Sequence, residues 1–203
     1  MTRITHLFTD LGGVLLTNGW DRGLRKLVAT NFTIDPAEMD ERHHLTYDTY
    51  EAGKISLSVY LRRVVFWEPR PFTEEQVVSF MLDQAKCFPE MIEMYKRIKE
   101  RNGLKVVVVS NEGRELTVDR IRRFNLKEFV DIFVVSSFVH FRKPDEDIFH
   151  IALDVAQAKP DEVVYVDDRH MFVEVAGQLG MHEIWHRDLD RTRADFEALG
   201  LSV

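Results

Sequence analysis

The stretch Phe8-Thr9-Asp10-Leu11-Gly12-Gly13-Val14 decides how we interpret this chain. Its first residues continue a short apolar run that ends at an acid, and two glycines follow, which is typical of a buried strand that runs into a loop. A carboxylate at this point can attack an electrophilic phosphorus or carbon atom and can also bind a metal ion. Glycine lets the backbone approach a ligand closely. Alone, the pattern is weak evidence, because strand-Asp-Gly turns are common.

The composition limits the classes of protein. The chain has 203 residues, of which 45% are hydrophobic, so we expect one well-packed core with at most a modest insertion. A formal net charge of -7 argues against nucleic-acid or anionic-membrane binding, since both need a positive surface. The single cysteine, Cys87, excludes an intramolecular disulfide and is interpreted as structural or incidental. No signal peptide or membrane-spanning run is evident, so we expect a cytoplasmic protein.

Apolar runs further along the chain predict four more strands. They cover residues 105–109, 132–135, 163–166 and 183–185. Helical patterns at 90–101, 114–123, 145–156 and 172–179 separate them. Strands that alternate with helices predict an α/β fold with a doubly wound, parallel, five-stranded (Rossmann-like) sheet and right-handed crossovers. In such sheets ligands bind beyond the carboxyl ends of the strands, which is where Asp10 lies.

Residues 17–86 break this alternation. They contain helical patterns at 22–29, 36–51, 57–66 and 74–84 and no strong strand. We interpret them as a small helical cap inserted after the first strand, so that residues 1–16 and 87–203 form the α/β core and 17–86 the cap. A cap above the strand ends would exclude water and select the substrate. The alternative is that these helices extend the core.

Two polar groups follow the second and third predicted strands. Ser110-Asn111 ends the second strand, and its hydroxyl and amide can donate hydrogen bonds to phosphoryl oxygens. A helix cap is the alternative role. Lys143, in Arg142-Lys143-Pro144, could neutralise both a phosphate and an anionic nucleophile, the alternative being a surface lysine before a helix.

A pair of adjacent acids, Asp167-Asp168, ends the fourth predicted strand. Adjacent carboxylates at the end of an apolar strand repel one another. They are explained by a hard cation such as Mg²⁺, which binds carboxylate, carbonyl and water oxygens. Acids also cap helices, but two of them exceed what capping needs.

The order of these groups resembles the haloacid dehalogenase superfamily. Its pattern is an aspartate after the first strand, Ser or Thr after the second, a downstream Lys-Pro, and paired acids after the fourth. This chain matches that order with Asp10, Ser110-Asn111, Lys143-Pro144 and Asp167-Asp168. The resemblance covers essentially the whole chain, and it extends to the helical-cap sugar-phosphate phosphatases whose first motif is Asp-Leu-Gly.

The resemblance implies a role for each matching residue. Asp10 would be the nucleophile and would form an aspartyl-phosphate, with Lys143 as its catalytic partner. Ser110, Asn111 and Lys143 would bind the phosphoryl group. Mg²⁺ would be held by Asp10, the Gly12 carbonyl and Asp168, with Asp167 acting through water or as a further ligand. The implied protein is a Mg²⁺-dependent phosphatase of a small phosphorylated metabolite, working as a monomer or homodimer.

One departure from the family pattern concerns the proton. Superfamily phosphatases usually place a second aspartate, as general acid and base, two residues after the nucleophile, where this chain has Gly12. General acid–base help is worth about 10²–10⁴-fold in rate. The substrate could have a good leaving group, such as an anomeric sugar phosphate or an acyl phosphate. A cap or loop residue, His43, His44 or Glu112, could supply the proton, or turnover could be slow.

A second departure is at Phe172, where relatives often carry a polar residue that orients the lysine or the metal site. Arg169, next to the paired acids, is either a surface residue or a substrate contact. Trp20 is the one tryptophan placed to line a pocket.

Two alternative functions remain open at this stage. A 2-haloacid dehalogenase would use the same aspartate on carbon without a metal, but it usually lacks the paired acids. A weakly active or non-catalytic ligand-binding protein would bind phosphate esters without Mg²⁺-dependent turnover.

Overall fold

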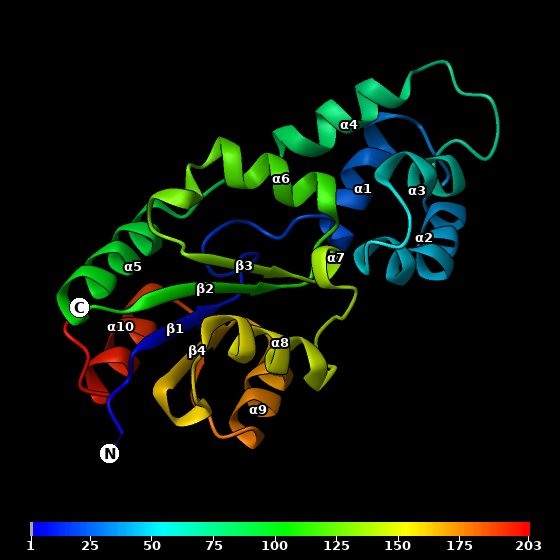
Figure 1. Ribbon diagram of the computed structural model, residues 1–203. Helices are drawn as coiled ribbons and strands as arrows, with labels where there is room; N and C mark the ends of the chain where they lie inside the picture. The colour runs from blue at the N-terminus through cyan, green and yellow to red at the C-terminus, as the bar shows by residue number, and fades with distance from the viewer. Residues whose placement is uncertain (1) are drawn as a thin grey trace.

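The computed structural model describes residues 2–203, and a five-stranded parallel sheet lies at its centre (Figure 1). The strands are β1 (His6–Thr9), β2 (Lys105–Ser110), β3 (Ile132–Val135), β4 (Val163–Asp167) and β5 (His182–Trp185). Their order is β3-β2-β1-β4-β5, which confirms the predicted doubly wound α/β fold. Because β1 pairs with both β2 and β4, the chain changes direction across the sheet at β1, and the crevice typical of ligand sites opens beyond the ends of β1 and β4.

The helices follow the predicted pattern with two additions. In chain order they are α1 (Arg22–Asn31), α2 (Pro36–Glu51), α3 (Leu57–Val64), α4 (Glu74–Asp83), α5 (Pro89–Asn102), α6 (Arg114–Arg123), α7 (Ser136–Val139), α8 (Glu146–Ala156), α9 (His170–Gln178) and α10 (Leu189–Ala198). The sequence patterns did not predict α7 or α10. Within residues 2–203, no helix is both long enough and apolar enough to cross a membrane.

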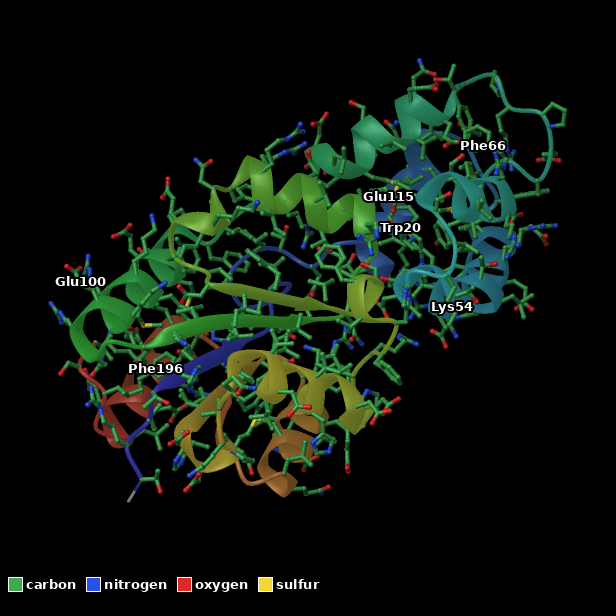
Figure 2. The ribbon with its side chains drawn as sticks, viewed as in Figure 1. Trp20, Lys54, Phe66, Glu100, Glu115 and Phe196 are labelled. Carbon is green, nitrogen blue, oxygen red and sulfur yellow. The ribbon has the colours of Figure 1, made fainter. Side chains whose placement is uncertain are left out.

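The two faces of the sheet are buried by different helices. Leu7 of β1 packs with Tyr95 of α5 and Phe196 of α10, which points toward the sheet in Figure 2. Phe8, the next residue, packs on the other face with Phe149 of α8 and with α9. Burial of one such side chain stabilises the fold by about 1.5–3 kcal/mol. Coverage of both faces explains why β2, β3 and β4 contain runs of consecutive apolar residues.

The helices α1 to α4 begin at side chains that satisfy their free backbone N–H groups. Asp21 accepts a hydrogen bond from Leu24 N in α1, and Asp35 caps α2, which starts with a proline. Ser56 caps α3. Thr73 forms a reciprocal capping box with Gln76 at the start of α4. Such caps are worth about 0.5–2 kcal/mol each and fix where each helix begins.

The segment that contains α1 to α4 has its own apolar cluster, which includes Trp20, Tyr60 and Leu61 and reaches Leu116 of α6. Trp20 and Glu115 lie where this segment meets α6 (Figure 2). The chain enters and leaves the segment side by side, since Thr17 N donates to Lys86 O at 2.9 Å and Lys86 N donates to Thr17 Oγ1 at 3.1 Å. The predicted boundaries at residues 16/17 and 86/87 fall at this contact, and the division into core and cap stays a prediction.

Candidate active site

Lys143 lies at the centre of the candidate site. Its side chain is fully buried, and its Nζ lies 2.6 Å from Asp167 Oδ2 and 3.2 Å from Asp10 Oδ1. Burial disfavours the charged ammonium, but the two carboxylates outweigh it and raise the pKa of Lys143. The topology thus brings three of the predicted site residues into direct contact: Asp10 directly after β1, Asp167 at the end of β4, and Lys143 in the loop after α7.

Two aromatic side chains complete the surroundings of Lys143. Its Nζ donates to the Tyr165 hydroxyl at 3.0 Å, and that hydroxyl donates in turn to Asp167 Oδ2. The Phe172 ring lies on another side, with 5.1 Å between its centroid and Nζ, a distance at which a cation is attracted to the ring face. Phe172, which departs from the family pattern, therefore packs against the same lysine that a polar residue would orient.

Asn111 fixes the loop that carries Lys143. Its side-chain oxygen accepts from Lys143 N at 2.8 Å, and its side-chain nitrogen donates to Lys143 O at 2.8 Å. This pair of bonds joins the end of β2 to the loop. It fixes the position of the Lys143 backbone, from which the side chain extends into the site. The predicted contact of Asn111 with a phosphoryl group stays a prediction, and its side chain has one N–H left to make it.

Three carboxylates gather at the strand ends. Oxygen atoms of Asp10, Asp167 and Asp168 lie within 4.8 Å of one another. Burial raises the pKa of the Asp10 carboxyl, Lys143 opposes this effect, and Asp167 adds to it. Burial, together with the charges of Asp10 and Asp167, raises the pKa of Asp168 to about 6. One cation, Lys143, faces three acids, so the cluster has an excess of negative charge.

The donor set fits a hard divalent cation. Among the described residues, the buried Asp168 Oδ1 accepts no hydrogen bond, and Asp10 Oδ1 has the ion-pair contact with Lys143 Nζ but no hydrogen bond, although buried polar atoms are normally satisfied. Both atoms are carboxylate oxygens, the ligand type that Mg²⁺ prefers. Gly13 shapes the same place: it has a φ of +77°, and a Cβ there would lie 2.2 Å from Asp168 Oδ2. The predicted Mg²⁺ ligands therefore lie together, while their binding of the ion stays a prediction.

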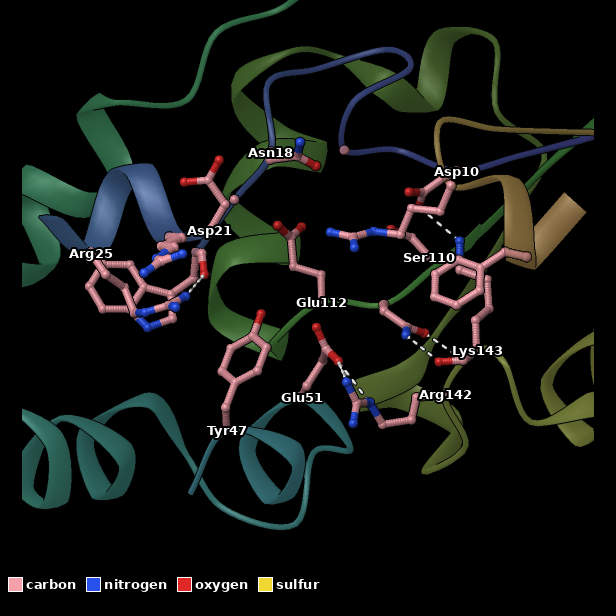
Figure 3. A pocket seen from close by; sticks show the side chains of 17 residues that line it. Asp10, Asn18, Asp21, Arg25, Tyr47, Glu51, Ser110, Glu112, Arg142 and Lys143 are labelled. Carbon is pink, nitrogen blue, oxygen red and sulfur yellow. Dashed lines mark hydrogen bonds and ion pairs between the residues drawn. The ribbon is translucent and has the colours of Figure 1, made fainter. Parts of the chain in front are cut away.

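A cavity of about 320 Å³ opens beside Asp10, between the sheet and helices α1 and α2 (Figure 3). The predicted residues Asp10, Gly12, Ser110, Asn111 and Lys143 line it, as do Trp20, Arg169 and Phe172. Asp167 and Asp168 lie beside Asp10 but are not among the residues that line the cavity. A ligand in the cavity would thus meet Asp10 directly.

The three residues proposed as proton donors lie in different places. Glu112 is buried and lines the cavity. His43 of α2 is buried, and its Nδ1 lies 2.8 Å from the Tyr60 hydroxyl of α3. His44 is exposed and lies 3.6 Å from Asp40. Of the three candidates, only Glu112 faces the cavity.

Several residues of the cavity wall were not found from the sequence. Glu51 of α2 is buried and accepts from Arg142 Nε at 2.8 Å, and Tyr47 and Arg25 also line the cavity. Glu51 and Arg142 are 91 positions apart, so no local pattern relates them. Tyr165 could have been found, because it lies two residues before Asp167 on the same strand and therefore on the same face.

The motif order, the strand topology and the carboxylate cluster agree with a match between residues 4–180 and the family model described as haloacid dehalogenase-like hydrolase. The chain belongs to the haloacid dehalogenase-like hydrolase family. The family resemblance noted in the sequence is confirmed.

Similar proteins of this haloacid dehalogenase-like family include phosphatases. The hydrolase is 25% identical over 210 residues to bifunctional epoxide hydrolase 2 of Sus scrofa, covering 93% of this chain and 37% of the relative. It is 30% identical over 111 residues to the pyrophosphatase PpaX of Bacillus cereus, covering 52% of this chain and 51% of the relative. The match thus spans between about a third and about half of the length of these curated relatives.

A solved structure has the same fold as the haloacid dehalogenase-like hydrolase described here. It is a family enzyme of Bacteroides thetaiotaomicron in complex with magnesium and inorganic phosphate, with a TM-score of 0.76 and 18% identity. The alignment covers 91% of this chain and 94% of that one. At this identity the likeness shows the fold.

Proposed function

We propose that this hydrolase is a Mg²⁺-dependent phosphatase that acts on a small phosphorylated metabolite through Asp10. The observation that carries the proposal is the contact of the buried Lys143 ammonium with Asp10 at 3.2 Å and with Asp167 at 2.6 Å, beside a polar cavity that Asp10 and Lys143 line. An anionic nucleophile and an anionic phosphoryl group repel one another, and a buried cation beside the nucleophile offsets that repulsion.

In the first step, an oxygen of Asp10 bonds to the phosphorus while the bond from phosphorus to the leaving oxygen breaks. Ser110, Asn111 and Lys143 hold the phosphoryl oxygens by hydrogen bonds during the transfer. In the second step, water bonds to the phosphorus of the aspartyl-phosphate, and the carboxylate of Asp10 is released. Asp10 suits this role because it lines the cavity and is held against Lys143.

The residues that would hold the metal are Asp10, Asp168 and the Gly12 carbonyl, with Asp167 as a further or water-mediated ligand. Bound Mg²⁺ would stabilise the negative charge of the phosphoryl group and orient it toward the nucleophile. Support comes from the buried oxygens of Asp10 and Asp168 that accept no hydrogen bond, and from the magnesium and phosphate bound by the similar Bacteroides thetaiotaomicron enzyme.

The cavity supports a small substrate. Its volume of about 320 Å³ is at the lower end of the roughly 300–1,000 Å³ usual for ligand pockets, and its wall is rich in charged and amide side chains. A compact, hydroxyl-bearing leaving group, such as that of a sugar phosphate, could hydrogen-bond to these groups.

The test is a panel of phosphorylated metabolites, assayed with Mg²⁺ and with a chelator. We expect phosphate release that requires Mg²⁺ and is lost in Asp10→Asn, while Asp131→Asn keeps the activity. Asp131 directly precedes β3, at the end of the sheet opposite to the site, and it pairs with Lys99. Phosphate release by Asp10→Asn at the wild-type rate would exclude the nucleophile assignment. Halide release from 2-haloacids without Mg²⁺ would favour a dehalogenase, and phosphate-ester binding without turnover would favour a binding protein.

A further inference from the structure

Gly12 leaves the first motif without its usual proton donor, and one buried carboxylic acid faces the same cavity. We propose that Glu112 is the general acid and base of this hydrolase, protonating the leaving oxygen in the first step and activating water in the second. The inference rests on the proposed phosphatase function, and it assigns a catalytic residue that lies outside the four family motifs.

The position of Glu112 follows from the topology. It comes directly after Asn111, at the carboxyl end of β2, which pairs with β1 and therefore ends beside Asp10. Its side chain is 7% exposed and lines the cavity together with Asp10 and Gly12. In Figure 3 it lies between the cap residues Asp21 and Arg25 on one side and the core residues Asp10 and Ser110 on the other. A leaving group that extends from Asp10 toward the cap would pass it.

The carboxyl group of Glu112 is held firmly in this orientation. Arg120 Nη1 lies 3.0 Å from Oε1, and Thr117 Oγ1 donates to Oε2 at 3.3 Å. The backbone at Gly19 also lies against this carboxyl group, since a Cβ on Gly19 would lie 2.4 Å from Glu112 Oε1. Gly12 has little room for a side chain, because a Cβ there would lie 3.0 Å from Asn18 Oδ1.

The charges around Glu112 suit a group that must both give and take a proton. Burial raises the pKa of the Glu112 carboxyl, and the charges of Asp10 and Glu51 act in the same direction. Arg120 and the Thr117 hydroxyl oppose this by stabilising the carboxylate. A general acid works best when its pKa lies near the working pH, and a raised pKa brings a glutamate closer to it.

The other polar groups are less well placed. Glu51 Oε2 lies 2.8 Å from Arg142 Nε and 2.5 Å from Arg142 Nη2, so both contacts bind it to the guanidinium of the loop after α7. His43 contacts Tyr60 inside the cap segment and does not line the cavity. His44 lies at the surface.

The proton balance of the two steps is complete without a further reactant. As Asp10 bonds to phosphorus, the O–H bond of protonated Glu112 breaks, and the proton goes to the leaving oxygen, which departs as an alcohol. The Glu112 carboxylate then takes a proton from water as the water oxygen bonds to phosphorus. Cleavage of the bond between Asp10 and phosphorus then restores the Asp10 carboxylate. Glu112, which now carries the proton from water, is ready for the next cycle.

The experiment compares Glu112→Gln with wild type on two esters in the presence of Mg²⁺. p-Nitrophenyl phosphate has a leaving group that needs no proton, whereas the alkoxide of β-glycerol phosphate does. We expect Glu112→Gln to lose about 10²–10⁴-fold in kcat/KM on the alkyl ester and less than about tenfold on the aryl ester, because kcat/KM reports only the steps up to departure of the leaving group. With the alkyl ester, the decline of wild-type kcat/KM at high pH should disappear in the variant.

The matched control is Glu115→Gln, three residues further along. Glu115 does not line the cavity, and its Oε1 accepts from Leu57 N at 2.9 Å. We expect Glu115→Gln to change kcat/KM equally on both esters.

If Glu112→Gln does not fold, Gly19→Ala serves instead, because its Cβ would displace the Glu112 carboxyl while leaving the acid in the chain. The same selective loss on the alkyl ester is expected.

Equal losses of kcat/KM on the two esters in Glu112→Gln, or no loss of kcat/KM on the alkyl ester, would overturn the proposal. So would a wild type that hydrolyses only the aryl ester, since it would have no working acid. In each of these cases the Asp10-dependent hydrolysis of p-nitrophenyl phosphate still supports the phosphatase function. A wild type that hydrolyses neither ester with Mg²⁺ would contradict both.

Discussion

Lys143 Nζ lies 2.6 Å from Asp167 Oδ2, and solvent reaches neither side chain. A buried charge without a partner costs several kcal/mol, so the lysine and the aspartate depend on each other. Asp10 shares the same ammonium at 3.2 Å. Removal of the Lys143 charge would therefore both destabilise the fold and leave the acids of the site without a counter-charge.

Replacement of the shared cation tests this coupling. In Lys143→Met, Asp10 and Asp167 are left without a counter-charge, and we expect the free energy of unfolding at neutral pH to fall by about 3–5 kcal/mol. Phosphatase activity should be lost as well. Urea denaturation measures the first effect, with Lys127→Met, at an exposed position, as the control. A stability within about 0.5 kcal/mol of wild type would show that the ammonium does not balance these acids.

Mg²⁺ binding should stabilise the folded protein through Asp168. Saturating Mg²⁺ should raise the melting temperature, since a ligand at about 100 times its Kd adds about 2.7 kcal/mol, and Asp168→Asn should reduce this shift. The pKa of Asp168 is raised to about 6, so the carboxylate that a metal needs is replaced by the acid below that pH. The Mg²⁺-dependent shift should therefore shrink between pH 7 and pH 5. An undiminished shift in Asp168→Asn would place the ion elsewhere.

Gly13 and Gly103 form a matched pair of substitutions. Both have a left-handed backbone, with φ of +77° and +67°, so alanine is strained at either position by about 1 kcal/mol. Only at Gly13 would the new Cβ also collide with Asp168, 2.2 Å from Oδ2, whereas nothing lies within 4 Å at Gly103. We expect Gly13→Ala to weaken Mg²⁺ binding, measured by calorimetry, and Gly103→Ala to leave it unchanged. Equal affinities would show that Asp168 can move without cost.

His43 should make the protein sensitive to acid. Burial, with the charges of Arg25 and His44, lowers its pKa to about 4, whereas the unfolded chain titrates near 6.5. The unfolded state therefore binds more protons between these values, and stability is lost as the pH falls from about 6.5 to about 4, by a total on the order of 3 kcal/mol. His43→Gln should flatten this decline in urea denaturation. If His43→Gln loses as much stability at low pH as wild type does, other titrating groups cause the acid sensitivity.

The architecture could be predicted because strands that are buried on both faces leave a strong pattern. The apolar runs that end at Asp10, Ser110 and Asp167 place polar residues at one edge of a parallel sheet, whatever the details of packing. The short α7 has no such pattern. The α10 helix is amphipathic only weakly, and its burial depends on Phe196 meeting Tyr95 of α5 on the same face of the sheet.

The surroundings of Lys143 could not be predicted in the same way. Its contacts join it to Asp10, 133 positions earlier, and to Tyr165 and Phe172, further on in the chain. The cavity wall likewise combines α2 with the loop after α7 through Glu51 and Arg142. Contacts such as Glu51–Arg142 depend on how the segment that contains α1 to α4 packs on the sheet, and no local sequence pattern specifies that packing.

The hydrogen bonds between Thr17 and Lys86 have an evolutionary consequence. Because the two chain crossings touch, the intervening segment could be lengthened, shortened or exchanged without a change in the path of any strand. The entropy of closing such a loop grows only slowly with its length, so the sheet tolerates these changes. New leaving-group preferences could therefore be acquired by insertion and recombination at one point of the chain, while Asp10, Lys143 and the paired acids keep their positions.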